Sequence, residues 1–221
     1  MSLLAFRDVT CVRGGRVLFE ALSFALEPGG AALVTGANGA GKSSLIRVAA
    51  GLLRPASGRV EGDAPCALLT DAASLDEELP LAKALGFWAG LDGRGKKVND
   101  ALTALELNDL AEIPVRLLST GQRRRAAFAR LVVSGAPVWL LDEPANGLDA
   151  EALGRLEDAI ASHRADGGTV VVASHSPIAL PDARAIHLRL PGEGRGPVTS
   201  GPMLDPGVDL RSTSSRRGGA V

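Results

Sequence analysis

Between positions 36 and 43 the chain reads GANGAGKS, a stretch whose residue types and spacing suit the binding of phosphate groups. It matches the pattern G-x-x-x-x-G-K-[ST], whose glycines let successive backbone N–H groups turn toward an anion. Lys42 can then reach the terminal phosphates of a nucleotide, and the Ser43 hydroxyl is a suitable Mg²⁺ ligand. Taken alone, the motif also allows a glycine-rich turn before a core helix. The residues expected to bind nucleotide are Gly36, Ala37, Asn38, Gly39, Ala40, Gly41, Lys42, Ser43 and Ser44.

Two carboxylates, Asp142 and Glu143, follow the apolar run 138–141. In a phosphate-loop enzyme, an acid at such a strand end holds Mg²⁺, often through water, and its neighbour orients and deprotonates the attacking water. We expect Asp142 to take the first role and Glu143 the second. Without the phosphate loop, the same pair would fit equally well as solvated acids at the end of a strand.

The elements that must position these residues alternate between strands and helices. Strand-like apolar runs lie at 31–35, 65–70, 138–141, 169–173 and 184–190, with helix-like runs after the first and third. Such alternation predicts a parallel sheet that binds its ligand at the carboxyl ends of the strands. Two further strands within 3–26, joined by the Gly14-Gly15 turn, predict an N-terminal hairpin.

The spacing of apolar residues changes between 74 and 134, where they recur at helical intervals, as in Leu81, Leu85 and Trp88. This pattern predicts a helical subdomain inserted into a single domain that covers 1–190. The segment 191–221 is rich in Gly, Pro, Ser and Arg without periodicity, which predicts a flexible tail.

Composition limits the function classes. The chain has 221 residues, 46% of them apolar, and a net charge of -1, so it has no overall basic field that would attract nucleic acid. Cys11 and Cys66 are too few and too far apart for a zinc pattern, and we expect two buried free thiols in a reducing compartment. We expect neither a signal peptide nor a membrane-spanning segment, so any channel would belong to another chain.

The residues 118–122 read LSTGQ and precede a helix-like run. A hydroxyl and a glycine N–H at the start of a helix offer donors and a positive end to an anion, although Ser119 would also serve as a simple N-cap. Together with GANGAGKS, the WLLDE strand end and the later His175, this stretch resembles the signature sequence of the ATP-binding-cassette (ABC) ATPases. The resemblance runs from about residue 3 to residue 190 in the family's order.

The resemblance implies an α/β fold of the P-loop NTPase, ABC-ATPase type, with a RecA-like core, an N-terminal antiparallel β-subdomain and an inserted helical subdomain. It also implies a head-to-tail homodimer in the ATP state, in which Ser119, Gly121 and Gln122 of one chain cap the γ-phosphate held by the other. Asp149, in NGLD, resembles the family's loop that crosses this interface, and it suits a helix N-cap as well. His175 matches the switch histidine, which contacts the γ-phosphate and supports Glu143, so that Glu143, His175 and Lys42 form the catalytic set.

Three consecutive arginines, Arg123, Arg124 and Arg125, follow the signature. We expect them to form the solvated and interface face of the signature helix, and we consider nucleic-acid binding by this run a minor alternative.

Two positions depart from the family. Members usually stack adenine on an aromatic residue near the end of the first strand, and the matching residue here is Arg13, whose planar guanidinium can also stack on a base. The family expects a Gln after the strand at 65–70, to touch Mg²⁺ and to signal to the membrane subunit. Asp71 occupies that position, where a shorter, charged acid could still contact Mg²⁺ but could alter coupling.

The chain is similar to the haem-exporter ATPases of cytochrome c maturation, the CcmA-like subfamily. The similarity lies in these departures and in the segments 78–88, 113–131 and 136–150. Asp71 and Ala145-Asn146 differ from that subfamily's usual residues. The resemblance implies ATP and Mg²⁺ as ligands and a CcmB-like permease with CcmC-like and CcmD-like subunits as partners. It also implies a place on the cytoplasmic face of a bacterial inner membrane, with no direct haem site on this chain and no nucleic-acid partner.

Three alternatives remain open at this point. An ABC ATPase for another exported substrate would keep every catalytic residue and dock to a different permease. A soluble ABC protein acting on DNA or ribosomes usually has a coiled-coil insertion or two fused cassettes, neither of which occurs in this sequence. A degenerate regulatory subunit is disfavoured by the intact Lys42, Glu143 and His175.

Overall fold

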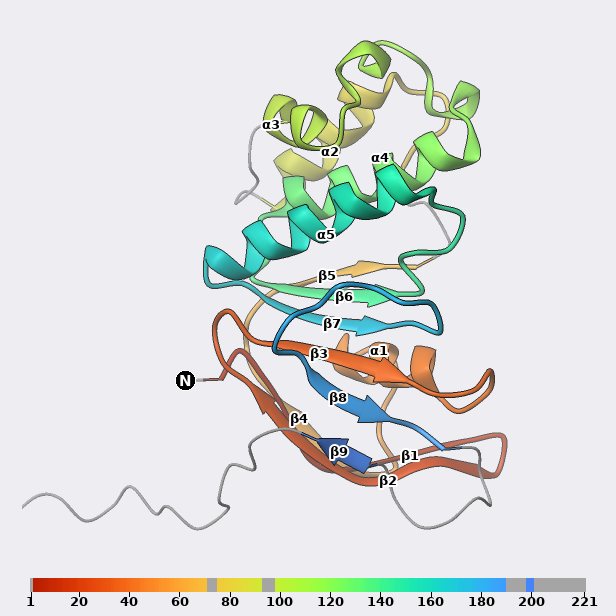
Figure 1. The fold of residues 1–221 in the computed structure, drawn as a ribbon, viewed down its shortest axis with the longest axis vertical. Coiled ribbons are helices and arrows are strands. Elements are labelled where there is room, and N and C mark those ends of the chain that lie inside the picture. The colour runs from red at the N-terminus through yellow and green to blue at the C-terminus, as the bar shows by residue number, and fades with distance from the viewer. Residues whose placement is uncertain (1, 71–74, 93–97, 190–197, 201–221) are drawn as a thin grey trace, which may run out of the picture.

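The computed structural model describes residues 2–70, 75–92, 98–189 and 198–200. Its first sheet is antiparallel, in the order β2-β1-β4, and lies at the lower end of the molecule in Figure 1. The strands are β1 (Leu4–Arg13), β2 (Arg16–Leu26) and β4 (Ser57–Glu61). Gly14 and Gly15 join the first two strands with φ of +56° and +75°, a conformation that glycine adopts without steric cost. The predicted N-terminal hairpin is confirmed.

The second sheet carries the phosphate-loop strand at an inner position, in the order β5-β6-β7-β3-β8-β9. Its strands are β3 (Ala31–Thr35), β5 (Cys66–Leu69), β6 (Val138–Asp142), β7 (Thr169–Ala173), β8 (Arg184–His187) and β9 (Val198–Ser200). All neighbours pair in parallel except β9, which runs antiparallel to β8. The predicted parallel sheet is confirmed, whereas β9 falls within the segment that we assigned to a flexible tail.

Helices cover both faces of the parallel sheet. The helix α1 (Lys42–Ala49) lies between the two sheets, and its Leu45 and Ile46 are buried with Phe6 of β1 and Leu140 of β6. On the other face, α4 (Thr120–Ser134) and α5 (Ala150–Ala165) pack against Trp139 and Leu141. Because β6 buries residues on both faces, it reads as a continuous apolar run rather than an alternating one.

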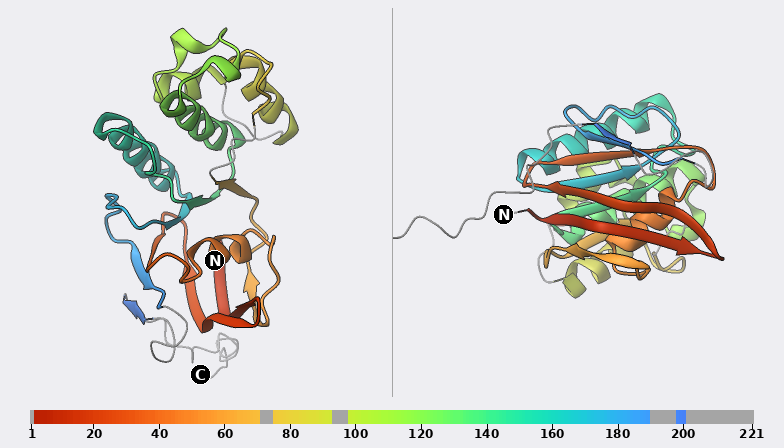
Figure 2. Two further views of the ribbon diagram at one scale, coloured as in Figure 1. Left: turned by 90° about the vertical axis from the view of Figure 1, so that its right-hand side faces the viewer. Right: turned by 90° about the horizontal axis from the view of Figure 1, so that it is seen from below.

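The remaining helices gather around α4 in a lobe beyond the parallel sheet, at the end opposite the antiparallel sheet (Figure 2). They are α2 (Leu81–Asp92), α3 (Val98–Ala104) and the short 3₁₀ turns η1 (Asn108–Leu110) and η2 (Val115–Leu117). Leu81, Leu85 and Leu102 are buried in this lobe with Phe128 of α4. The inserted helical subdomain is therefore confirmed, and its limits of 74–134 within 1–190 stay a prediction.

Cys11 is buried as predicted, whereas Cys66 differs from the sequence prediction. Cys11 is 1% exposed, but Cys66 is exposed, because β5 is the outermost strand of the parallel sheet. Neighbouring protein atoms still reduce solvation of both thiols, which raises the pKa of Cys11 and of Cys66 above the usual value. Both thiols therefore stay protonated at neutral pH.

None of the helices in the described part of the chain has the length and apolar character needed to cross a membrane.

Candidate functional site

The phosphate loop connects β3 to α1 at the carboxyl end of the parallel sheet. Gly36 has a φ of +143°, and a side chain there would collide with the carbonyl group of Leu188. Gly41 has a φ of +103°, and a Cβ atom would lie 2.9 Å from the Cβ of Leu18 on β2. Glycine is thus required at both positions, and the second contact seats the N-terminal hairpin directly against the loop.

Lys42 is the first residue of α1, and its side chain turns back over the loop. Its ammonium group donates to the carbonyl oxygens of Gly36 at 2.9 Å and Ala37 at 3.4 Å. The same Nζ atom lies 3.6 Å from Oε1 of Glu143, and the lysine side chain is only 6% exposed. A buried positive charge beside inward-turned backbone N–H groups is the arrangement that binds phosphate.

Ser43 and Asp142 meet although they are far apart in the sequence. The Ser43 hydroxyl donates to Oδ1 of Asp142 at 3.0 Å, so a hydroxyl oxygen and a carboxylate lie together beside the phosphate loop. Mg²⁺ prefers hard oxygen ligands, and it is usually held by one or two protein groups plus substrate phosphates. The two side chains therefore fit this ion. Asp71, the third expected metal ligand, lies outside the described residues.

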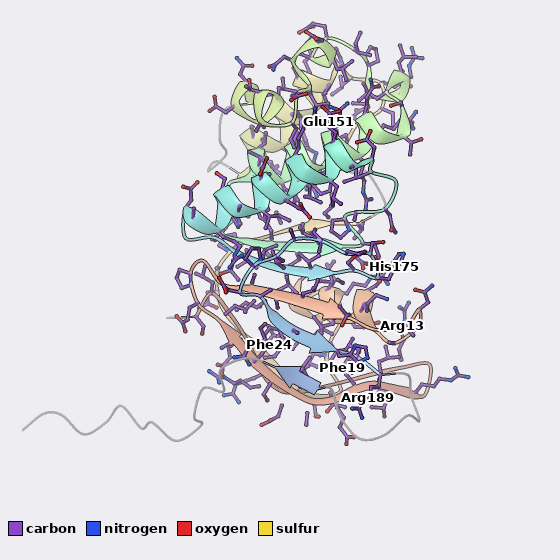
Figure 3. All side chains as sticks on the ribbon, viewed as in Figure 1. Arg13, Phe19, Phe24, Glu151, His175 and Arg189 are labelled. Atoms are coloured by element: carbon purple, nitrogen blue, oxygen red, sulfur yellow. The ribbon has the colours of Figure 1, made fainter. Side chains whose placement is uncertain are left out.

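His175 binds the carboxylate group of Glu143. Oε2 of Glu143 accepts the backbone N–H of His175 at 3.1 Å and lies 2.7 Å from its Nδ1, so the tautomer protonated at Nδ1 donates a second hydrogen bond. The Glu143 side chain is 17% exposed, and that of His175 is 50% exposed. His175 follows β7 and faces outward at the carboxyl end of the sheet (Figure 3). Lys42, Glu143 and His175 are thus brought together, as expected.

The signature residues lie elsewhere, at the start of α4. Ser119 caps this helix by accepting the N–H of Gln122 at 3.2 Å, and the Gln122 side chain accepts the N–H of Ser119 at 2.8 Å, which completes a capping box. Asp149 similarly caps α5 by accepting the N–H of Ala152 at 2.8 Å. Ser119, Gly121, Gln122 and Asp149 line one cavity of about 460 Å³. Among the described residues that line this cavity, none comes from the phosphate loop.

Arg13 is exposed at the end of the β1–β2 hairpin, opposite Arg16 on the neighbouring strand. Figure 3 shows Arg13 and His175 on the same side of the molecule, the side toward which the parallel strands point. Leu18 of the same hairpin contacts Gly41, so this hairpin lies against the phosphate loop, and the stacking of Arg13 on a base stays a prediction.

The expectation that the arginine run forms one solvated and interface face is wrong as regards the solvated face, and its place at an interface stays a prediction. Successive residues of an α-helix are about 100° apart, so three in a row cannot share one face. All three side chains are half-buried and donate to backbone carbonyls of different segments. Arg123 binds Leu118 and Arg116, Arg124 binds Thr70 and Glu143, and Arg125 binds Leu105 and Glu106. The helical period alone separates the three side chains, but it does not indicate the contact of Arg124 with the backbone of Glu143.

Comparison with known proteins gives consistent results. The ABC transporter family model matches residues 19–146. The cytochrome c biogenesis ATP-binding export protein CcmA of Sphingopyxis alaskensis is 59% identical over 181 residues, which cover 81% of this chain and 93% of the relative. The protein of the same name from Zymomonas mobilis is 49% identical over 84% of both chains.

Solved structures agree in fold. An ATP-binding subunit of an ABC transporter superposes with a TM-score of 0.75 at 21% identity, covering 90% of each chain. The protein cbiO1 of Clostridium perfringens, part of the ABC transporter complex cbiONQ, superposes with a TM-score of 0.73 at 22% identity, covering 90% of this chain and 88% of the other. At such identities the likeness concerns the fold alone.

Proposed function

We propose a function from one established premise: the chain belongs to the ABC transporter family, among the ATP-binding export proteins of cytochrome c biogenesis. It is accordingly an ABC-type ATPase, the ATP-binding subunit of an export transporter. Our proposal concerns which residues carry out hydrolysis, how two chains assemble and what the assembly exports. The observation that carries it is the Glu143 carboxylate, held by His175 on one side and facing the buried Lys42 on the other.

Hydrolysis would proceed by attack of water on the γ-phosphate. Glu143 orients this water and accepts its proton, while the contact with His175 keeps the carboxylate in place. Lys42 and the backbone of residues 36–44 bind the phosphates and neutralise charge in the transition state. Ser43 and Asp142 would hold Mg²⁺, which neutralises further charge on the phosphates, and Asp71 is a third candidate ligand.

A single chain would provide half of each of two ATP sites. The cavity lined by Ser119, Gly121, Gln122 and Asp149 is formed without the phosphate loop, so a nucleotide on that loop would need a second copy to supply these groups. The N-terminus of α4 and the Ser119 hydroxyl then face the γ-phosphate, and Asp149 lies at the interface. The proposed assembly is a homodimer that closes on ATP and opens after hydrolysis.

The relatives named for cytochrome c biogenesis support haem delivery, or release of a haem-loaded chaperone, as the exported function. On this proposal, the dimer drives a CcmB-like permease together with CcmC-like and CcmD-like subunits. It would act at the cytoplasmic face of the bacterial inner membrane, bind no nucleic acid and have no haem site of its own.

The role of Glu143 is tested by Glu143→Gln, which keeps the size of the side chain but removes its basicity. We expect turnover to fall by about 10²-fold or more, with an ATP-bound dimer accumulating, because the water loses its proton acceptor. Steady-state hydrolysis and size-exclusion chromatography with ATP measure both effects. Glu20→Gln, on an exposed position of β2, is the control and should retain turnover. Normal turnover in Glu143→Gln would refute the assignment.

The transport role is tested by haem staining of c-type cytochromes in source cells that carry Lys42→Ala. Loss of covalent c-type haem, with b-type haem and transcripts unchanged, is the expected result. If c-type haem is retained in a variant that no longer hydrolyses ATP, the exported substrate is a different one.

A further inference from the structure

Glu143 combines an acidic side chain with an unusual backbone conformation. Its φ of +49° lies in the left-handed region, which costs a residue with a Cβ atom free energy and persists only where the surroundings hold it. Its N–H donates to the carbonyl of Ala173 at 2.8 Å, and its carboxylate is bound by His175. Its own carbonyl group precedes Pro144, so the direction of this carbonyl helps to define how the chain turns away from the strand.

Arg124 supplies the donor to that carbonyl. Its Nη2 atom lies 2.5 Å from the Glu143 oxygen, and its Nη1 atom lies 3.5 Å from the carbonyl oxygen of Thr70, directly after β5. A charged donor makes a stronger hydrogen bond than a neutral one, particularly when it is half-buried. The planar guanidinium presents two donors at a fixed separation, so one side chain can bind both carbonyls.

Arg124 also lies on the signature helix. It is five residues after Ser119, within the first turns of α4. In the proposed dimer, Ser119 and Gly121 contact the nucleotide bound by the second copy, while Arg124 of the same helix contacts Glu143 of its own chain. A movement of α4 upon closure would therefore be transmitted to Glu143 through a single side chain.

We propose that Arg124 is a positioning residue for ATP hydrolysis: it holds the Glu143 backbone in the conformation that aims the carboxylate, and it links that conformation to the position of the signature helix. The inference rests on the proposed roles of Glu143 and of the signature residues. Arg124 itself touches neither the phosphate loop nor the reacting atoms in its hydrogen bonds to Thr70 and Glu143, so its effect is on the chemical step rather than on nucleotide binding.

The test compares steady-state ATP hydrolysis by Arg124→Ala, Arg124→Lys and the unchanged chain. Arg124→Ala is expected to lower kcat about tenfold while KM for ATP stays within about twofold, the pattern of an interaction needed only in the transition state. Arg124→Lys can reach one carbonyl but not both, so it should restore part of kcat. A thermal unfolding curve for each variant shows whether it is folded. If the alanine variant does not fold, the lysine variant still provides the test.

Arg130→Ala is the matched control. It removes the same charge from the same helix and breaks a comparable half-buried hydrogen bond, to the carbonyl oxygen of Leu68 in β5, away from the signature cavity. We expect it to retain kcat within about twofold. An equal loss of kcat in both variants would show a general effect of α4 stability and would overturn the proposal, as would a raised KM with unchanged kcat in Arg124→Ala.

A second measurement separates this proposal from the proposed function. In the Glu143→Gln background, ATP should still produce a dimer when Arg124→Ala is added, because closure does not require the carboxylate to be aimed. Loss of the dimer would assign Arg124 to closure and overturn the positioning role. Failure of Glu143→Gln alone to reduce hydrolysis would instead refute the role of Glu143, whatever Arg124 does.

Discussion

At the scale of single residues, Arg13 is the most unusual of the residues predicted to bind nucleotide. It lies opposite Arg16 on the neighbouring strand, and like charges in directly opposed positions of an antiparallel pair repel. The π-face of a base or the phosphates of a nucleotide would reduce this repulsion, and the hairpin already contacts the phosphate loop through Leu18 and Gly41. Stacking of the Arg13 guanidinium on adenine therefore stays a prediction.

Arg13→Ala should accordingly weaken ATP binding. A cation–π contact at an exposed site contributes about 0.5–1 kcal/mol, so the Kd should rise about two- to fivefold. Calorimetric titration of ATP measures it, Arg16→Ala is the control across the hairpin, and Arg13→Tyr should recover affinity because an aromatic ring stacks on a base as well. An unchanged Kd in Arg13→Ala would place the adenine elsewhere.

The residues that bind phosphate could be predicted from the sequence because they are neighbours in it. GANGAGKS forms a local loop, and its glycines show the backbone conformation that the pattern predicts. The environment of Arg124 could not be predicted in the same way. Its partners are the carbonyl groups of Thr70 and Glu143, distant in the chain and available from any residue type, so no side-chain pattern indicates them.

At the scale of elements, the first turn of α4 has one function that the structure shows and a second that we propose. The capping box of Ser119 and Gln122 stabilises the helix within one chain, whereas the proposed contact with phosphate needs a second chain. Both use the same hydroxyl group, which has one proton to donate and lone pairs that accept the N–H of Gln122. The cap uses a lone pair and leaves the proton for an anion.

Substitutions at Ser119 can separate these functions. Ser119→Asp keeps a good N-cap, so the unfolding temperature should change little, but its negative charge would repel the phosphate and abolish ATP-dependent dimerisation. Ser119→Ala loses the cap and should destabilise the chain by about 1 kcal/mol. Thermal unfolding and size-exclusion chromatography with ATP give the two readouts. Normal dimerisation of Ser119→Asp would leave the residue as a cap only.

Helices and strands could be predicted where a long periodic or apolar run existed. They could not be predicted where a strand forms only through pairing with its neighbour or where its exposure depends on strand order. The runs 31–35 and 169–173 coincide with β3 and β7 because both strands are buried within the sheet. The short β9 has no periodicity of its own and exists through pairing with β8. The exposure of Cys66 depends on β5 lying at the edge, and strand order is not encoded locally.

At the scale of the whole molecule, the fold divides the proposed chemistry between two lobes. The phosphate loop, Glu143 and His175 lie at the carboxyl end of the parallel strands, whereas the signature residues lie at the start of α4, next to the start of α5. The α/β class and the inserted helices followed from strand and helix alternation, but the relative placement of the two lobes required the structure. It depends on long-range contacts such as those of Arg124 and Arg130 with the carbonyls after and within β5.

The separation of the signature cavity from the phosphate loop has a genetic consequence. In the proposed dimer, a chain with Lys42→Ala could not use its own phosphate loop, yet its Ser119 and Asp149 would still contact the nucleotide on the loop of an intact partner. Produced alongside the intact chain, it should enter mixed dimers. The ATPase activity should then fall below the value expected if activity were proportional to the number of intact chains. Co-expression at rising ratios, followed by ATPase assays, measures this, and the combined variant Lys42→Ala with Ser119→Asp should no longer interfere. A defective allele of this protein is therefore expected to be dominant rather than recessive.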